Sequence, residues 1–222
     1  MTARGKARPR PEEPDLFGTA DDAAIVPKES LSTLREEAAH CTRCDLYRHA
    51  TQTVFGEGPA HAKIVLVGEQ PGDQEDLAGK PFVGPAGQLL DRALEEAGIA
   101  RDKVYITNAV KHFKFAPRGK RRIHSKPNAG EIKACKWWLA RELVTLAPNF
   151  MVALGATAAQ SLTGKAVAVT KLRGRETELM GVRGLITVHP SYLLRIPDEA
   201  GKAMAYKKFV ADLALAKKLA SA

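Results

Sequence analysis

The chain of 222 residues carries 34 Lys and Arg against 25 Asp and Glu, a net charge of +9, and 45% of its residues are hydrophobic. This length and composition suit one globular domain with a sizeable core and exclude a chain that is disordered throughout. The basic surplus is typical of a protein that binds a phosphate-rich partner, although such a surplus also serves solubility.

Residues 1–28 are predicted to form a flexible tail, because they hold four of the 13 prolines and four basic residues in the first ten. Residues 29–222 are predicted to form a single domain. Residues 14–18 (PDLFG) are a short apolar island that either packs on the domain or docks on a partner such as a replication clamp. The N-terminus lacks a secretory signal and no apolar run reaches the roughly 20 residues that cross a bilayer, so we expect a cytoplasmic protein without a membrane partner.

Strands and helices are predicted to alternate along the domain. Ser32 is expected to cap a first helix that runs toward Cys41. Four buried strands are indicated by continuous apolar runs at 63–67, 104–108, 150–154 and 185–188. Helices are expected over 84–97, 129–146, 155–162 and 199–220. This alternation predicts an α/β fold, a three-layer α/β/α sandwich with a central, mainly parallel four-stranded sheet.

Polar side chains follow the ends of these predicted strands. Glu69 and Gln70 follow the first strand, Asn108 ends the second, and His189 follows the fourth. The carboxyl ends of parallel strands share one edge of the sheet, where α/β proteins bind ligands, so we expect a ligand site there. A carboxylate at Glu69 suits a general base or the stabilisation of positive charge, although helix capping is the commoner role of such a residue.

Three cysteines cannot all pair within one chain, and Cys41 and Cys44 have the Cys-x-x-Cys spacing. A secreted disulfide scaffold is therefore excluded, and a reducing cytoplasm with a metal or cluster site is favoured over thiols without a metal. Cys135 is a third possible thiolate, and His112 is a candidate fourth ligand for zinc or for an iron–sulfur cluster. Composition leaves zinc and iron open.

The stretch 111–126 (KHFKFAPRGKRRIHSK) holds seven basic residues, two histidines, two phenylalanines and no acid. Basic and aromatic side chains together suit contact with a nucleic-acid backbone and stacking on its bases. A solvated basic loop is the alternative. Because the stretch lies between a strand end and a helix, at the expected ligand edge, we favour contact with DNA or RNA.

Four short motifs, in this order, resemble the uracil-DNA glycosylase superfamily: GEQPG at 68–72, KPFVGPAG at 80–87, TNAVK at 107–111 and HPS at 189–191. The Cys-x-x-Cys start is similar to the iron–sulfur, family-four branch of that superfamily. The KRRIH sequence at 120–124, with Gln70 and His112, resembles the UdgX group within the branch. The resemblance covers about residues 30–218 and implies the uracil-DNA glycosylase fold and a role in base excision repair of DNA.

The resemblance implies roles for the matching residues. Phe82 would stack on a flipped uracil, Asn108 would hydrogen-bond its edge, and His189 would stabilise the leaving uracil anion. Glu69 would stabilise positive charge on the sugar. His124 would be the nucleophile that attacks the anomeric carbon. Further substrate contacts are implied at Gln70, Gly72, Asp73, Arg122 and Ser191, and DNA contacts at Lys120, Arg121 and Arg122.

A [4Fe–4S] cluster is the cofactor that the resemblance implies, with Cys41, Cys44, His112 and Cys135 as its ligands. The implied partner is uracil-containing DNA, preferably single-stranded or with the uracil flipped from a duplex, and a monomer is expected.

Three functions compete at this point. The leading one is a UdgX-type glycosylase that ends covalently attached to deoxyribose through His124. The second is a turnover family-four glycosylase that releases uracil and leaves an abasic site; Gln70 and the KRRIH sequence speak against it. The third is a non-catalytic iron–sulfur or zinc module that binds nucleic acid, which has no need of Glu69, Asn108 and His189 together.

Overall fold

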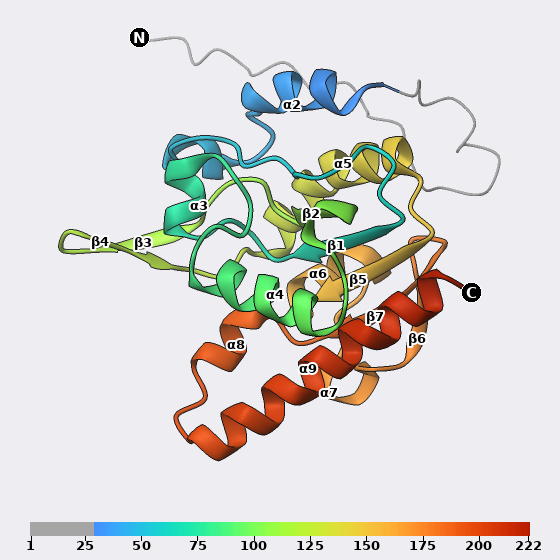
Figure 1. The fold of residues 1–222 in the computed structure, drawn as a ribbon. Helices are drawn as coiled ribbons and strands as arrows, with labels where there is room; N and C mark the ends of the chain where they lie inside the picture. The colour runs from blue at the N-terminus through green and yellow to red at the C-terminus, as the bar shows by residue number, and fades with distance from the viewer. Residues whose placement is uncertain (1–28) are drawn as a thin grey trace, which may run out of the picture.

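The computed structural model describes residues 29–222, and the predicted tail with its apolar island at 14–18 lies outside this range (Figure 1). A five-stranded sheet forms the centre of the domain, with strand order β2-β1-β5-β7-β6. Its strands are β1 (Ile64–Gly68), β2 (Val104–Asn108), β5 (Phe150–Leu154), β6 (Glu176–Leu179) and β7 (Val182–Thr187). Because β1, β2, β5 and β7 run parallel, their carboxyl ends share one edge.

The predicted α/β/α sandwich is confirmed, but the sheet has one strand more than the four predicted. The extra strand, β6, pairs antiparallel with β7, with Glu176 opposite Leu185 and Leu179 opposite Val182. Only Leu179 of β6 is buried. An edge strand of this kind lacks the continuous apolar run by which the other four strands were predicted.

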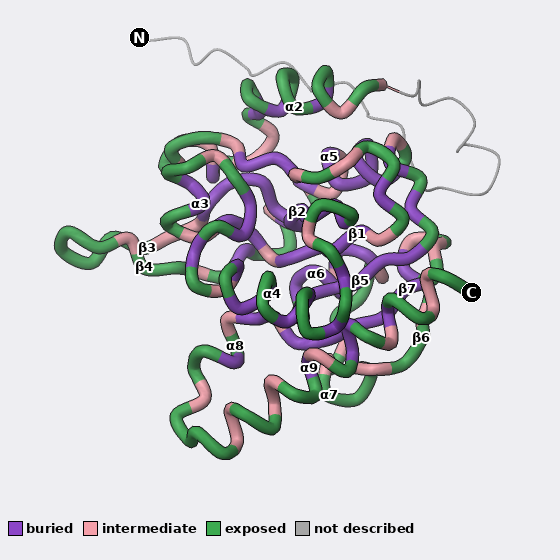
Figure 2. Tube along the Cα trace, in the orientation of Figure 1, coloured by how far each residue is buried: buried purple, intermediate pink, exposed green. Residues whose placement is uncertain are grey.

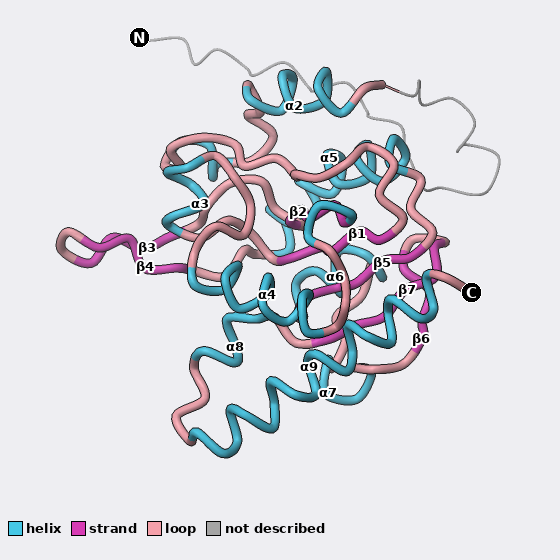
Figure 3. The backbone as a smooth tube through the Cα atoms, viewed as in Figure 1, coloured by secondary structure: helices cyan, strands magenta, loops and turns pink. Residues whose placement is uncertain are grey.

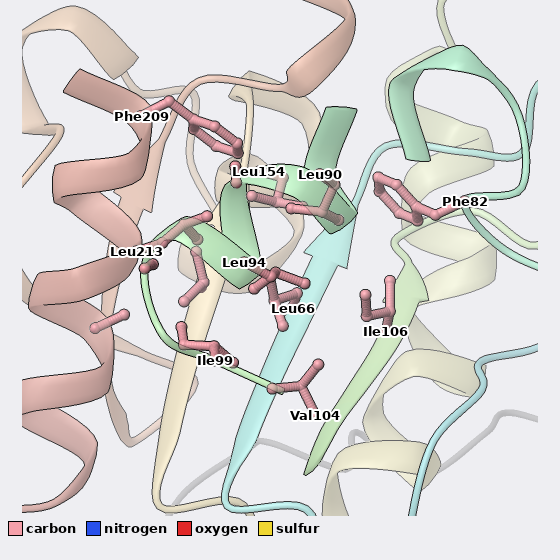
Figure 4. Packing of buried hydrophobic residues seen from close by; sticks show 14 of the residues in the cluster. Leu66, Phe82, Leu90, Leu94, Ile99, Val104, Ile106, Leu154, Phe209 and Leu213 are labelled. Atoms are coloured by element: carbon pink, nitrogen blue, oxygen red, sulfur yellow. The ribbon is translucent and has the colours of Figure 1, made fainter. Parts of the chain in front are cut away.

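Helices cover both faces of the sheet (Figure 1). One face carries α4 (Pro85–Glu96), α8 (Pro190–Leu194) and α9 (Glu199–Ala220), and the other carries α5 (Ala129–Leu146) and α6 (Ala156–Thr163). Alternate strand residues point to opposite faces. Leu66 of β1 therefore packs with Leu90 of α4 and Phe209 of α9 (Figure 4), whereas its neighbour Val65 packs in the cluster that contains Leu139 of α5.

The shorter elements are α2 (Leu31–Ala39), α3 (Asp73–Ala78), α7 (Val169–Leu172) and the 3-10 turns η2 (Asp45–Arg48) and η3 (Arg101–Lys103). The cap of α2 differs from the prediction: the Ser30 Oγ accepts the Thr33 N–H at 3.1 Å, and Ser32 lies inside the first turn. No helix within the described range is long and apolar enough to cross a membrane.

The basic stretch that was predicted to be a loop contains a β-hairpin of β3 (Phe115–Arg118) and β4 (Arg121–His124). Arg118 pairs with Arg121, so the turn between them has two residues. Its first residue, Gly119, has φ 60°, a value that tight hairpin turns require and that glycine adopts without strain. The hairpin projects from the body of the domain (Figures 1 and 3), and its outer part is exposed (Figure 2).

The last helix, α9, ends at the opposite edge of the sheet from the strands' carboxyl ends. Ala220 and Ser221 share the wall of a cavity of about 460 Å³ with Lys63 and Val104, which lie where β1 and β2 begin. The two edges of the sheet are therefore separate surfaces.

Candidate active site

A cavity of about 810 Å³ lies at the carboxyl ends of β1, β2, β5 and β7, the edge at which the sequence predicted a ligand site. Of the twelve residues predicted to act in catalysis, substrate binding or DNA binding, eight line it: Glu69, Gln70, Gly72, Phe82, Asn108, His124, His189 and Ser191. Four others do not line it: Asp73, Lys120, Arg121 and Arg122. The ends of parallel strands thus bring together residues from both halves of the chain.

The Glu69 carboxylate contacts side chains from two different elements of the cavity wall. Its Oε1 lies 3.2 Å from Nε2 of His124 on β4, and its Oε2 accepts a hydrogen bond from the Thr157 hydroxyl on α6. Burial would raise the pKa of Glu69, but the hydrogen bonds from His124 and Thr157 outweigh burial and lower the pKa below its ordinary value. Glu69 is therefore ionised at neutral pH and can stabilise a positive charge beside it.

His189 is held as a neutral imidazole. The Ser191 backbone N–H donates to Nδ1 of His189 at 3.2 Å, so we assign Nδ1 as an acceptor and the ring proton to Nε2. Ser191 Oγ lies 2.9 Å from the same Nδ1. Burial lowers the pKa of His189 to about 4, so the ring is uncharged at physiological pH. His189 thus offers a ligand one N–H donor without a positive charge.

Phe82 and Asn108 approach each other over a glycine. A Cβ atom at Gly68 would lie 2.3 Å from Oδ1 of Asn108 and 2.6 Å from Cζ of Phe82, so only glycine leaves room for both. Phe82 has φ 56°, a left-handed conformation that is uncommon for an aromatic residue, and its ring centroid is 5.7 Å from that of His189. The buried Oδ1 of Asn108 has no hydrogen-bond partner among the described residues. A flat ligand with an N–H donor in its plane would fit this pairing of an aromatic face and an open acceptor.

Gln70 holds the base of the hairpin. Its Nε2 donates to the carbonyls of Lys114 (3.1 Å) and Ser125 (3.0 Å), and its Oε1 accepts the Lys114 N–H at 3.1 Å. The amide is thus already engaged within the protein. Gln70 lines the cavity, and its contact with the substrate on the sugar side stays a prediction. Its amide also holds the hairpin that carries His124.

Arg122 is also an anchor of the hairpin. Its Nε donates to Oδ1 of Asp73 and its Nη1 to Oδ2 of Asp76, both at 2.6 Å. Both carboxylates engage the guanidinium within the protein, and the contacts of Asp73 and Arg122 with substrate or DNA stay predictions. That Arg122 helps to hold His124 also stays a prediction; the two residues lie on the same strand, β4. Lys120 and Arg121, at the exposed end of the hairpin, make no ion pair within residues 29–222 and are available to phosphates.

The three cysteines gather in one region between α2 and α5. Cys41 and Cys135 are buried in the same apolar cluster, Cys44 packs against it, and all three are free thiols. Burial raises the pKa of Cys135 to about 12, and Cys41 and Cys44 are near enough to add to this rise. Within the described range, no three His, Cys, Asp or Glu side chains are arranged to hold one metal ion.

His112 is joined to this region through Thr53. The Thr53 hydroxyl donates to the carbonyl of Ala38 at 2.8 Å and lies 3.0 Å from Nε2 of His112, and the same carbonyl accepts the Cys41 N–H. Nδ1 of His112 is buried without a hydrogen-bond partner among the described residues, and burial lowers the pKa of the ring. A neutral imidazole with an orphaned buried nitrogen is the condition in which histidine ligates a metal or cluster.

Comparison with known proteins identifies the family. The family described as "Uracil DNA glycosylase superfamily" matches residues 55–214. The chain belongs to the uracil-DNA glycosylase superfamily. It is 42% identical to a type-4 uracil-DNA glycosylase of Thermotoga maritima over 170 residues, which cover 76% of this chain and 85% of that protein. It is also 36% identical to a type-4 uracil-DNA glycosylase of Pyrobaculum aerophilum, over 83% of this chain and 92% of that protein.

These names agree with the family-four branch of the superfamily that the Cys-x-x-Cys spacing suggested. The finer assignment to the UdgX group rests on Gln70, His112 and residues 120–124 alone.

Thr157 is a site residue that the sequence reasoning missed, although it follows the third parallel strand as Glu69 follows the first.

Replacing Thr157 with the isosteric valine removes one of the hydrogen bonds that lower the pKa of Glu69. The pKa of Glu69 should rise. On acidification, Glu69 should therefore become protonated at a higher pH in the variant than in the wild type. We expect the acidic limb of the rate profile for uracil release to move to higher pH, with less than a roughly tenfold loss at pH 8. Coincident profiles for the two proteins between pH 4.5 and 8 would contradict this role.

Proposed function

We propose that this protein excises uracil from DNA. The observation that carries the proposal is the pairing of an open acceptor, Oδ1 of Asn108, with a neutral donor, His189, in a cavity walled by Phe82. Uracil offers the complementary pattern, an N–H between two carbonyl oxygens on a flat ring. A base inside a duplex cannot reach such a cavity, so the nucleotide must be flipped or supplied as single strand.

The chemistry follows from the charges of Glu69 and His189. The N-glycosidic bond breaks with its electron pair moving to N1 of uracil, which leaves positive charge on the sugar. The Glu69 carboxylate stabilises that cation, and the Nε2–H of His189 donates to the carbonyl oxygen on which negative charge develops. Water then adds to the anomeric carbon, Glu69 can accept its proton, and an abasic site remains.

We further propose that Cys41, Cys44, Cys135 and His112 hold a [4Fe–4S] cluster. Three free thiols in one region and the orphaned nitrogen of His112 support this donor set. In a zinc site all four ligands surround one ion, an arrangement that the described side chains do not have, whereas each ligand of a cluster binds a different iron. The cluster would be structural and would tie α2 to the segment between β2 and the hairpin.

The names of the relatives favour turnover, in which water captures the sugar cation. One observation favours a second candidate, covalent capture: the His124 imidazole lines the cavity beside Glu69. In that reaction a lone pair of the His124 ring forms the bond to the anomeric carbon while the bond to uracil breaks, and the proton on the other ring nitrogen is released to solvent.

A denaturing gel separates the two candidates. Wild-type protein is incubated with a single-stranded oligonucleotide that carries one uracil, and with the same oligonucleotide carrying thymine. Covalent capture predicts a heat-stable band of protein and DNA with uracil only, which His124→Ser abolishes while base release continues. Free abasic DNA from the wild type, with no such band, would establish turnover. No uracil release by either protein would overturn the proposed function, and a cross-link mapped to another residue would overturn the role of His124.

DNA affinity is expected to fall with salt, because Lys120 and Arg121 are available to phosphates at the end of the hairpin. Replacing both with glutamine should lower the slope of log affinity against log salt by about 0.7 for each phosphate of single-stranded DNA that the variant no longer neutralises. The measurement uses the His124→Ser background, so that any covalent product does not mask the equilibrium. The matched control replaces Lys207 and Lys208 on α9, which are also exposed. An equal change of slope in the two double variants would remove the hairpin as the electrostatic contact.

A further inference from the structure

Lys111 is a lysine with no exposed surface, three residues after Asn108, the residue proposed to bind uracil. Its Nζ donates to Oγ1 of Thr107 at 2.6 Å, to the backbone carbonyl of Asn108 at 2.8 Å, and to Oε2 of Glu142 on α5. All three donors of the ammonium are therefore engaged. Lys111 reaches neither the cavity nor the exposed surface, so it serves neither the reaction nor phosphate binding directly.

Glu142, the partner of Lys111, is also fully buried, and its carboxylate accepts hydrogen bonds from several neighbouring groups. Its Oε1 accepts the backbone N–H of Gly56 at 3.1 Å and the hydroxyl of Tyr105 at 2.9 Å. The hydroxyl of Thr107 lies within hydrogen-bond distance of both carboxylate oxygens. These contacts attach β2 and the backbone at Gly56 to α5. A buried ion pair of this kind adds little net stability over an apolar pair of similar volume, so stability alone does not account for it.

The backbone of Lys111 hydrogen-bonds one of the three cysteines and a second loop. Its N–H donates to Sγ of Cys135 at 3.1 Å, and its carbonyl accepts the Val54 N–H at 2.8 Å. One residue thus contacts Asn108 through its side chain and a thiol of the proposed cluster through its backbone.

We propose that Lys111, paired with Glu142, is a positioning residue for Asn108. The ammonium fixes the carbonyl of Asn108, and that contact sets the direction of the Asn108 side chain, whose Oδ1 has no partner among the described residues to hold it in the cavity. This inference rests on the proposed function, because it assigns Asn108 the recognition of uracil. Orientation of a binding group matters because a displacement of about 1 Å can cost on the order of a hundredfold in rate.

The test replaces both members of the pair, as Lys111→Met with Glu142→Gln, so that no buried charge is left alone. Two quantities are measured: the single-turnover rate of uracil release at saturating DNA, and the inhibition constant of free uracil. We expect a fall in rate of about tenfold to a hundredfold and a weaker inhibition by uracil of similar size, with the melting transition and the visible absorbance of any cluster retained. Lys114→Met is the matched control, since Lys114 is a lysine of the same basic stretch that pairs with Glu131; it should leave inhibition by uracil unchanged.

Wild-type rate and wild-type inhibition in the folded double variant would overturn the inference. Asn108→Ala is measured alongside: if it leaves both quantities unchanged, Asn108 does not recognise uracil, and the role of Lys111 fails while uracil excision stands. Absence of uracil release by the wild type would instead overturn the proposed function itself. A second measurement does not depend on how the variant folds. The ammonium of Lys111 should give a ¹⁵N signal protected from solvent exchange in the wild type, and free uracil should shift it. A protected signal that uracil does not move would also overturn the inference.

Discussion

Replacing His189 with alanine is expected to slow the release of uracil by about a hundredfold to a thousandfold, the usual cost of losing one donor that acts in the transition state. In the proposed mechanism the Nε2–H of His189 is the donor to the departing base, and the ring is neutral because burial lowers its pKa to about 4. Binding of DNA should change little, because the hairpin charges remain. The measurement is a single-turnover rate at saturating uracil-containing DNA.

The control for this variant is His61→Ala, at an exposed histidine outside the active-site cavity, which should retain the wild-type rate. Equal rates for the wild type and His189→Ala would remove His189 from the chemistry. A weaker affinity with an unchanged rate at saturation would instead make it a binding residue.

Replacing Cys135 with alanine is expected to remove the proposed [4Fe–4S] cluster and much of the stability with it. Metal-site binding energy is also folding energy, so a loss of several kcal/mol should lower the melting temperature by roughly 10 °C or more. Truncating a buried thiol side chain costs far less by itself. Iron content, visible absorbance and the melting temperature are measured together on protein purified without added reductant.

Two further variants test the donor set. Thr42→Ala lies in the same Cys-x-x-Cys loop and should keep the iron and the melting temperature. His112→Cys should keep a cluster, because cysteine thiolate is the usual ligand of iron–sulfur clusters. Full iron content in Cys135→Ala would exclude Cys135 as a ligand.

Most of the sheet could be predicted because a strand buried on both faces leaves a continuous apolar run in the sequence. The runs at 104–108 and 150–154 coincide with β2 and β5. The edge strand β6 could not be predicted in this way, because only one of its four residues is buried.

The hairpin was missed for another reason. Its strands are mostly exposed, so charge dominated the pattern, although Gly119 between two short runs was the available turn signal.

The site was predictable where it depended on strand ends. Glu69 and His189 follow parallel strands and Asn108 ends one, and the fold alone brings them to one cavity. What the sequence could not supply was the partner of each polar group. Arg122 lies in a stretch rich in basic residues, which suggested contact with phosphates, yet its side chain meets Asp73, 49 residues earlier in the chain. Such pairings depend on how α3 and the hairpin pack, which no local pattern records.

The end of α9 has a practical consequence for protein engineering. Ala220 and Ser221 lie with the starts of β1 and β2, while every residue proposed to act on uracil lies at the opposite edge. A fluorophore, surface tether or fused reporter joined after Ser221 would therefore face away from incoming DNA. A probe for uracil in genomic DNA could be built by attachment at this end, whereas a label on the hairpin would compete with the nucleic acid for the same space.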